Sequence, residues 1–266
     1  MKKYRIIDAH CHIYPDKIAL KASQSTGNFY GIDMHYDGTV STLHKIGEEG
    51  GVDHFIVQSV ATKPEQVSSI NRFIAQSVAE SGGKMTGLGT LHPDSQDIKG
   101  DFEELISLGL RGVKLHPDIQ GFKLDDYRCL KIYELCEGRA PVLLHTGDSR
   151  YDFSNPNRLV PILDIYTGLT VIGAHFGGYS VWDDAVRVLP QYPNMYVDCS
   201  SAFFAMDDDR IRELISAYGE DRVLFGTDYP MWEPKREVER LLSLGLSDEA
   251  YEKIFHRNAE KLFDIE

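Results

Sequence analysis

The stretch IDAHCH, residues 7–12, decides how this chain is interpreted. The residues that lead into it, YRII at 4–7, are aromatic and β-branched, which favours a strand. Because side chains alternate along a strand, Asp8, His10 and His12 point to the same side. Two imidazoles on one face at the carboxyl end of a strand can bind one metal ion. The alternative is a pair of core histidines, and the choice depends on whether the chain supplies further ligands.

Strand-like runs recur along the chain, with helical patterns between them. Each run is short, rich in Val, Ile and Leu and largely free of charge, as in a parallel sheet buried on both faces. We expect strands near residues 4–10, 53–60, 84–91, 110–116, 141–145, 169–175, 194–200 and 222–228. Strict strand–helix alternation favours closure into a barrel over an open doubly wound sheet. The sequence also lacks a Gly-x-Gly-x-x-Gly turn after its first strand. The prediction is an α/β protein, a single-domain (β/α)₈ TIM barrel spanning residues 1–266.

Capping and glycine patterns place the helices. The segment 62–65 has the spacing of a capping box, and the helix that it starts is expected to end at Gly82 and Gly83. A second helix is expected from Asp101 to Gly109. Further helices are expected at 125–137, 157–167, 180–191, 207–218 and 234–244, with one or two closing helices in 247–263. The connection from 14 to 38 is unusually long, and we expect it to form a lid or wall over the site.

Composition limits the partners. The 266 residues have a formal net charge of −13, which argues against a nucleic-acid or anionic-membrane surface. No apolar run reaches ~18 residues and no signal region precedes the first strand, so we expect a cytoplasmic protein. The four cysteines fit no disulfide framework, and Cys129 and Cys136 are expected to face the core. The expected partner is a small-molecule substrate, and a homodimer is left open.

Histidines gather at the predicted strand ends, where the active sites of barrel enzymes lie. Strand ends are occupied by His10, His12, His92, His116, His145 and His175, together with Lys114, Asp148, Asp198, Ser201 and Asp228. His35, His44 and His54 have no such placement and are expected at the surface. Three neutral imidazoles and a carboxylate suit Zn²⁺ first, with Mn²⁺, Fe²⁺, Co²⁺ or Ni²⁺ as alternatives. Spacing alone does not decide whether His145 or His175 completes the ligand set.

The ordered motifs resemble those of the metal-dependent amidohydrolase superfamily. They are His10-Cys-His12, then His145, then His175 followed by Phe-Gly-Gly, and finally Gly-Thr-Asp228-Tyr-Pro. The chain is similar over essentially its whole length to the amidohydrolase-related branch, the relatives of aminocarboxymuconate-semialdehyde decarboxylase. The resemblance implies one divalent metal ion bound by His10, His12, His145 and Asp228. It also implies that His175 is the catalytic acid/base or polarises the substrate, rather than being a permanent metal ligand.

Four further residues are predicted to bind substrate. Lys114 and His116 lie on one face of a predicted strand. The alternatives for Lys114 are a structural lysine and a carboxylated lysine that bridges two metal ions. The alternatives for His116 are a metal ligand and a group that supports the ligands. Arg150 could bind a substrate carboxylate bidentately, with a surface arginine as the alternative. Trp232 is expected in the pocket wall, with core packing as the alternative.

Two functions are consistent with these residues. In the first, a metal-dependent hydrolase, metal-activated water attacks a small amide, lactone or ester while Asp228 and His175 move protons. The second is a metal-dependent decarboxylase or hydratase of a small unsaturated or aromatic carboxylic acid. The compact length favours hydrolysis. A barrel that only binds ligands would not need a proton carrier such as His175, and a nuclease would need a more basic surface.

Overall fold

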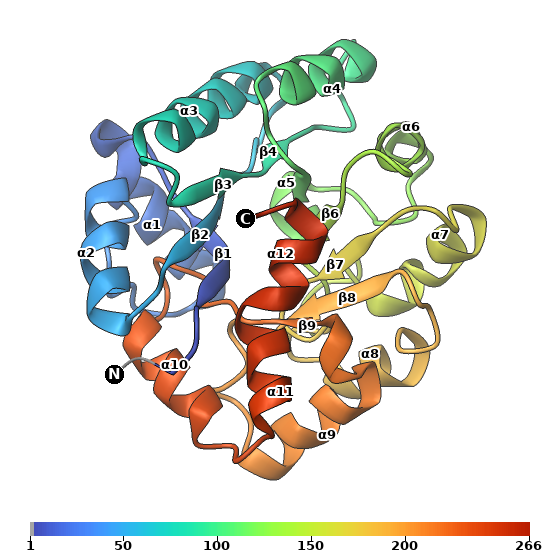
Figure 1. The fold of residues 1–266 in the computed structure, drawn as a ribbon. Helices are drawn as coiled ribbons and strands as arrows, with labels where there is room; N and C mark the ends of the chain where they lie inside the picture. The colour runs from blue at the N-terminus through green and yellow to red at the C-terminus, as the bar shows by residue number, and fades with distance from the viewer. Residues whose placement is uncertain (1–2) are drawn as a thin grey trace.

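The Val-, Ile- and Leu-rich runs form the strands of a closed barrel in the computed structural model, which describes residues 3–266 (Figure 1). The strands are β1 (Ile7–His12), β2 (His54–Gln58), β3 (Met85–Gly87), β4 (Gly89–Thr90), β5 (Val113–Leu115), β6 (Val142–Leu144), β7 (Val171–Gly173), β8 (Met195–Asp198) and β9 (Val223–Leu224). All pairings are parallel and join strands that are neighbours in sequence.

The predicted strand 84–91 is divided at Leu88 because the chain changes its hydrogen-bonding partner there. Leu88 N–H still donates to Val57 O of β2 at 2.9 Å, whereas Gly89 N–H donates to Gly112 O at the start of β5, also at 2.9 Å. The barrel closes between its first and last strands, where Ala9 N–H donates to Phe225 O at 2.8 Å. The predicted (β/α)₈ TIM barrel is thus confirmed.

An outer ring of helices surrounds the strands (Figure 1). The helices are α1 (Asp16–Tyr30), α2 (Val40–Gly50), α3 (Val67–Glu80), α4 (Ile98–Ser107), α5 (Pro117–Gln120), α6 (Tyr127–Cys136), α7 (Val160–Ile165), α8 (Trp182–Val188), α9 (Asp208–Tyr218), α10 (Pro234–Leu242), α11 (Asp248–Glu252) and α12 (Asn258–Phe263). A π-helical turn, Lys253–Arg257, joins the last two. No helix within residues 3–266 has both the length and the apolar character needed to cross a bilayer.

Three local predictions are wrong. The capping box assigned to 62–65 does not form, because Gln66 Oε1 instead accepts from the backbone N–H of Lys63 at 3.0 Å, and a 3-10 turn precedes α3. The helix expected from Asp101 begins at Ile98, since the Asp97 side chain accepts from Gly100 N–H at 2.9 Å and caps it. His54 is buried on β2 rather than at the surface, and its Nε2 lies 2.8 Å from the hydroxyl of Thr86.

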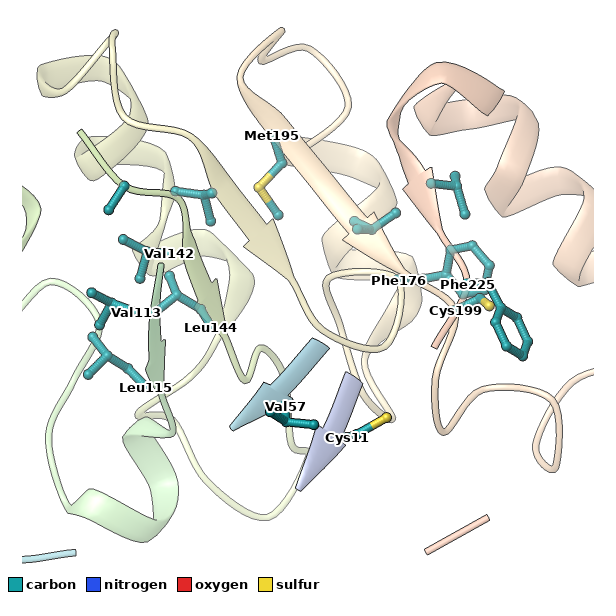
Figure 2. Packing of buried hydrophobic residues seen from close by; sticks show 14 of the residues in the cluster. Cys11, Val57, Val113, Leu115, Val142, Leu144, Phe176, Met195, Cys199 and Phe225 are labelled. Atoms are coloured by element: carbon teal, nitrogen blue, oxygen red, sulfur yellow. The ribbon is translucent and has the colours of Figure 1, made fainter. Parts of the chain in front are cut away.

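Apolar side chains fill both sides of the barrel wall. Figure 2 shows Val113 and Leu115 of β5 beside Val142 and Leu144 of β6, in the layer between strands and helices. Cys129 and Cys136 are buried in the same layer, as predicted. A smaller cluster includes Ala259 and Phe263 of α12. The strand residues that pack with them come from the inner side of the barrel wall: Ile7, Ile56, Leu143, Ile172 and Leu224. Figure 1 shows α12 across the barrel opening, so this helix closes the amino end and leaves the carboxyl end for a site.

Candidate metal centre

Strand β1 and the segment after β9 are tied together by Asp8. Its carboxylate accepts from the backbone N–H of Thr227 at 2.9 Å and from the Thr227 hydroxyl at 2.6 Å. His12 N–H also donates to Tyr229 O at 2.7 Å. These bonds hold the loop that contains Asp228 beside the histidines of β1.

Three donor atoms converge at this junction. His10 Nε2 and His12 Nε2 are 3.2 Å apart, and Asp228 Oδ1 lies 3.4 Å from the first and 3.6 Å from the second. A tetrahedral ion with bonds of ~2.0–2.1 Å has ligand–ligand edges of about 3.3–3.4 Å. The three atoms therefore already have the spacing of one face of a coordination sphere, and their chemistry fits a divalent transition metal.

Buried neighbours orient each of these donors. His10 Nδ1 lies 2.9 Å from Asp198 Oδ2, which directs Nε2 toward the site in the carboxylate–histidine arrangement typical of metal centres. Ser201 donates to Asp228 Oδ2 at 2.6 Å and leaves Oδ1 to the site. Trp232 donates to the Ser201 hydroxyl at 2.8 Å and does not line the cavity, so the expected pocket-wall position is wrong.

Burial sets the protonation of the donors. It lowers the pKa values of His10 and His12 well below the ordinary value, so both imidazoles are neutral, as a metal ligand must be. Burial raises the pKa of Asp228 to about 7, although the Ser201 hydrogen bond and the charge of Lys114 favour its ionised form. A proton and a cation therefore compete for Asp228 near neutral pH.

A lysine ammonium lies against the same donors. Lys114 is fully buried on β5, and its Nζ is 3.3 Å from His10 Nε2. Burial lowers its pKa to about 8, while the carboxylates of Asp228 and Asp198 act in the opposite direction. The site thus holds a buried primary amine at the edge of the donor set.

His175 and His145 form a second part of the site. His175 Nδ1 lies 3.0 Å from the carbonyl oxygen of Ser200, so this nitrogen donates and Nε2 is left without a hydrogen. That Nε2 faces His145 Nδ1 at 3.2 Å, and His145 Nε2 lies 3.6 Å from Asp118 Oδ2. His145 is adjacent to the compact set of His10, His12 and Asp228 but does not share it.

His145 also belongs to a cluster with His116 and Asp118 whose donor atoms approach one another. The two imidazole rings are stacked, with centroids 4.0 Å apart and planes only 6° from parallel. Ring-nitrogen lone pairs lie in the ring planes, so two stacked, nearly parallel rings cannot both direct a lone pair at the same ion. This cluster is a hydrogen-bonding group rather than a second metal centre.

Tyr30, which sequence analysis did not assign to the site, reaches it from the end of α1. Its hydroxyl is 2.7 Å from His116 Nε2. His116 Nδ1 accepts from the backbone N–H of Ile119 at 3.3 Å, so the neutral ring has its hydrogen on Nε2 and donates to Tyr30. The hydroxyl hydrogen of Tyr30 is then available to His145, whose ring nitrogens lie 3.4 and 3.5 Å from the hydroxyl oxygen, or to a ligand in the cavity.

The site opens into a cavity of about 480 Å³. The cavity is lined by seven predicted site residues: His10, His12, Lys114, His116, His145, His175 and Asp228. The connection that was expected to form a wall does so, since Tyr14, Phe29 and Tyr30 also line the cavity. The signal missed in the sequence is that this connection contains a 15-residue helix, α1, which brings Tyr30 inward.

Arg150 does not reach the cavity. Its guanidinium donates to the buried carboxylate of Asp148 at 2.6 Å and to the carbonyl oxygen of Phe29 at 2.5 Å. The cation also lies over the rings of Phe29 and Tyr30, 4.9 and 5.4 Å from their centroids. Arg150 therefore does not occupy the expected substrate-binding position. Its contacts instead fasten the end of α1.

Two site residues have left-handed backbones. His175 has φ 60° and Asp228 has φ 59°, although neither is glycine. Such conformations cost of order 1–3 kcal/mol and are concentrated at functional sites. Both residues follow the ends of strands, and the strained backbone is retained where their side chains meet the cavity.

A barrel whose carboxyl rim brings His10, His12 and Asp228 to the spacing of metal ligands, with His175 beside them, defines a class of metal-dependent barrel enzymes. A family model described as amidohydrolase matches residues 7–265. The chain therefore belongs to the amidohydrolase family.

One curated relative is 2-amino-3-carboxymuconate-6-semialdehyde decarboxylase of Dictyostelium discoideum, 27% identical over 203 residues. The match covers 60% of this chain and 55% of the relative, so it spans about half of that protein. An uncharacterised TIM-barrel protein from Bordetella bronchiseptica has a TM-score of 0.81 at 23% identity, with 98% of both chains covered. A 5-carboxyvanillate decarboxylase from Novosphingobium aromaticivorans, solved with manganese, has a TM-score of 0.75 at 17% identity, with 99% of both chains covered. These structures show the fold.

Proposed function

We propose that the protein is a metal-dependent decarboxylase of a small unsaturated or aromatic carboxylic acid. The main support is Lys114, a fully buried ammonium 3.3 Å from His10 Nε2 at the deep end of the cavity. Asp228 and Asp198 already favour this buried cation, and a substrate carboxylate placed beside it would add a direct counter-charge. The activity named for the curated relative agrees with this choice.

The proposed ligands are His10, His12 and Asp228, with His145 as the fourth. A divalent ion bound there, Zn²⁺ or Mn²⁺ first, would supply positive charge that polarises a substrate oxygen. The manganese of the similar solved structure makes Mn²⁺ a second metal to test. Asp198 and Ser201 keep the donors oriented.

His175 is the proposed proton carrier. In decarboxylation the bond between carbon and carboxylate breaks, CO₂ leaves, and the electron pair that remains on carbon takes up a proton. The overall change is R–COO⁻ plus H⁺ giving R–H plus CO₂. His175 lines the cavity, and Nε2 is the nitrogen left to carry the proton, because Nδ1 is fixed by the Ser200 carbonyl; Nε2 lies 3.2 Å from His145 Nδ1. Tyr30 is placed to orient the substrate, because its hydroxyl lies beside His116 and His145 where this residue lines the cavity.

Hydrolysis of a small amide, lactone or ester is the second candidate, and the sequence alone favoured it. The observation that supports it is the donor set itself, because a catalytic ion held by few protein ligands keeps a position open for water. Asp228 and His175 would then move the protons. Hydrolysis gives Lys114 no comparable role, and for this reason we place it second.

A parallel screen separates the two functions. The metal-loaded protein is assayed for CO₂ release from aromatic and unsaturated carboxylic acids, and for hydrolysis of lactones, esters and amides. We expect CO₂ release, and the His175→Ala variant should keep its metal while turnover falls ~10²-fold or more. Hydrolysis without CO₂ release would reverse the order of the candidates. Unchanged turnover in His175→Ala would remove His175 from the mechanism.

A further inference from the structure

The cavity has two chemically different parts. Its deep part contains the metal donors, His175 and Lys114. Its outer part lies between α1 and α3 and is lined by apolar side chains: Ile18, Phe29, Met34, Ile70, Phe73 and Ile119. A ligand that fills the whole space must therefore have one polar and one apolar end.

Positive charge is confined to the deep part. Within residues 3–266, Lys114 is the single lysine or arginine that lines the cavity. Arg150, the other cation near this rim, is held by Asp148 and the Phe29 carbonyl. The polar groups of the outer part are uncharged, including Ser69 and Gln66 of the α3 side. A charged group placed among these apolar side chains would meet no counter-charge and would lose the part of its hydration that they displace, which is costly.

We propose that the substrate is a monocarboxylic acid whose carboxylate lies at Lys114 and whose apolar body extends outward between α1 and α3. The inference rests on the proposed function, because the reacting carboxylate defines which end enters first. The cavity of about 480 Å³ is larger than the ~150 Å³ apolar cavity that accepts benzene. A single unsubstituted ring leaves the outer part unfilled, and a second carboxylate at the far end is rejected.

A matched pair of acids tests the proposal without requiring turnover. The metal-loaded protein is titrated calorimetrically at pH 7.5 with trans-cinnamate and with 4-carboxycinnamate, which differ only by a carboxylate at the distal end. Because that carboxylate would lie in the outer part, we expect 4-carboxycinnamate to bind at least 10-fold more weakly.

Ile70→Lys tests the converse, because it adds a positive charge to the outer part of the cavity. Ile70 is half-buried on the inner side of α3, so a lysine there supplies the missing cation in the outer part. The variant should bind 4-carboxycinnamate at least 10-fold more tightly than the unmodified protein does, and trans-cinnamate more weakly. Gln76→Lys adds the same charge to an exposed position of α3 that does not line the cavity, and it should change neither affinity.

Equal affinities for the two acids in the unmodified protein would overturn the proposal, as would binding of neither. Since this comparison needs no variant, it stands even if Ile70→Lys fails to fold. Gain of 4-carboxycinnamate binding in Gln76→Lys as well would assign the effect to overall charge and would also overturn it. Selective binding of trans-cinnamate with no CO₂ release from any acid would refute the proposed decarboxylation while supporting the substrate shape.

Discussion

His10 has both ring nitrogens engaged, and this makes it the residue on which the metal site depends. Nδ1 lies 2.9 Å from the Asp198 carboxylate, while Nε2 is within 3.4 Å of His12, Asp228 and Lys114 donor atoms. His10 Nε2 is thus close to the donor atoms of both His12 and Asp228 and to the amine of Lys114. Its removal should therefore affect metal binding more than loss of one coordinate bond would suggest.

We expect His10→Ala and Asp228→Asn to reduce the metal content from about one ion per chain to less than a tenth of that, as measured by elemental analysis after dialysis. The matched control is His92→Ala, because His92 is also a buried histidine after a strand but does not line the cavity. It should keep its metal. The same measurement on His145→Ala tests the fourth ligand, and full occupancy there would exclude His145 from the metal shell.

Tyr30→Phe removes the hydroxyl that lies beside His116 and His145 in the cavity. A neutral hydrogen bond contributes ~0.5–1.5 kcal/mol, so trans-cinnamate should bind about 3- to 10-fold more weakly while the metal content is unchanged. Tyr179→Phe is the control, since Tyr179 packs against the rings of His145 and His175 without lining the cavity. An effect of equal size in both variants would mean that Tyr30 acts only through packing.

The predicted site residues that the structure brings together lie directly at strand ends. His10 and His12 share one strand, and Asp228 follows β9, so alternation and the barrel rule bring them together. Arg150 was placed wrongly because Asp148, two residues away, captures its guanidinium. Tyr30 was missed because its position depends on how α1 packs, which no local pattern specifies.

At the scale of elements, α1 determines the shape of the cavity. Its sequence is rich in residues of modest helix propensity, including Ser23, Ser25, Thr26 and Gly27, and this explains why the segment was expected to be a long connection. Gly27 is required by packing, since a Cβ there would lie 2.5 Å from the Ile32 carbonyl oxygen. Tertiary contacts, rather than propensity, therefore stabilise this helix.

Arg150 supplies one of those contacts, so Arg150→Ala should loosen the end of α1. Hydrogen exchange of the peptides that cover 16–30 should rise several-fold, and trans-cinnamate should bind more weakly because Phe29 and Tyr30 are no longer held. Arg158→Ala is the control: Arg158 lies in the same β6–α7 connection, but it bonds to Asp125 and Asp152 instead of α1. Unchanged exchange in 16–30 would show that Arg150 does not fasten the helix.

At the scale of the whole molecule, the repeat of buried strand and amphipathic helix was sufficient to predict the barrel. That repeat can be recognised from the local composition of a single sequence. The division at Leu88 was not predictable in the same way, because it results from a change of partner between β2 and β5. The fold was thus easier to predict than the details of its cavity, since the cavity depends on contacts between segments far apart in sequence.

Stability of the whole barrel should depend on pH through Glu237, a buried carboxyl of α10. Burial raises its pKa from an ordinary 4.5 to about 8, with the charge of Asp8 acting in the same direction and that of Arg240 against it. Between these values the folded protein binds the proton more tightly than the unfolded chain. The contribution of Glu237 to the free energy of unfolding is therefore fully present below about pH 4.5 and is lost as pH rises toward 8.

Glu237→Gln should remove this dependence, because the amide has no charge to bury. Between pH 6 and pH 8 the unmodified protein should lose up to about 2 kcal/mol of unfolding free energy through this group. Urea denaturation at both pH values should show that the variant does not undergo this loss. Relative to the unmodified protein, its free energy of unfolding should therefore rise by the same amount between pH 6 and pH 8. Glu239→Gln, an exposed position of the same helix, should leave the pH dependence as it is. A Glu237→Gln protein that loses as much stability between the two pH values as the unmodified one would mean that Glu237 is already ionised in the fold at pH 6.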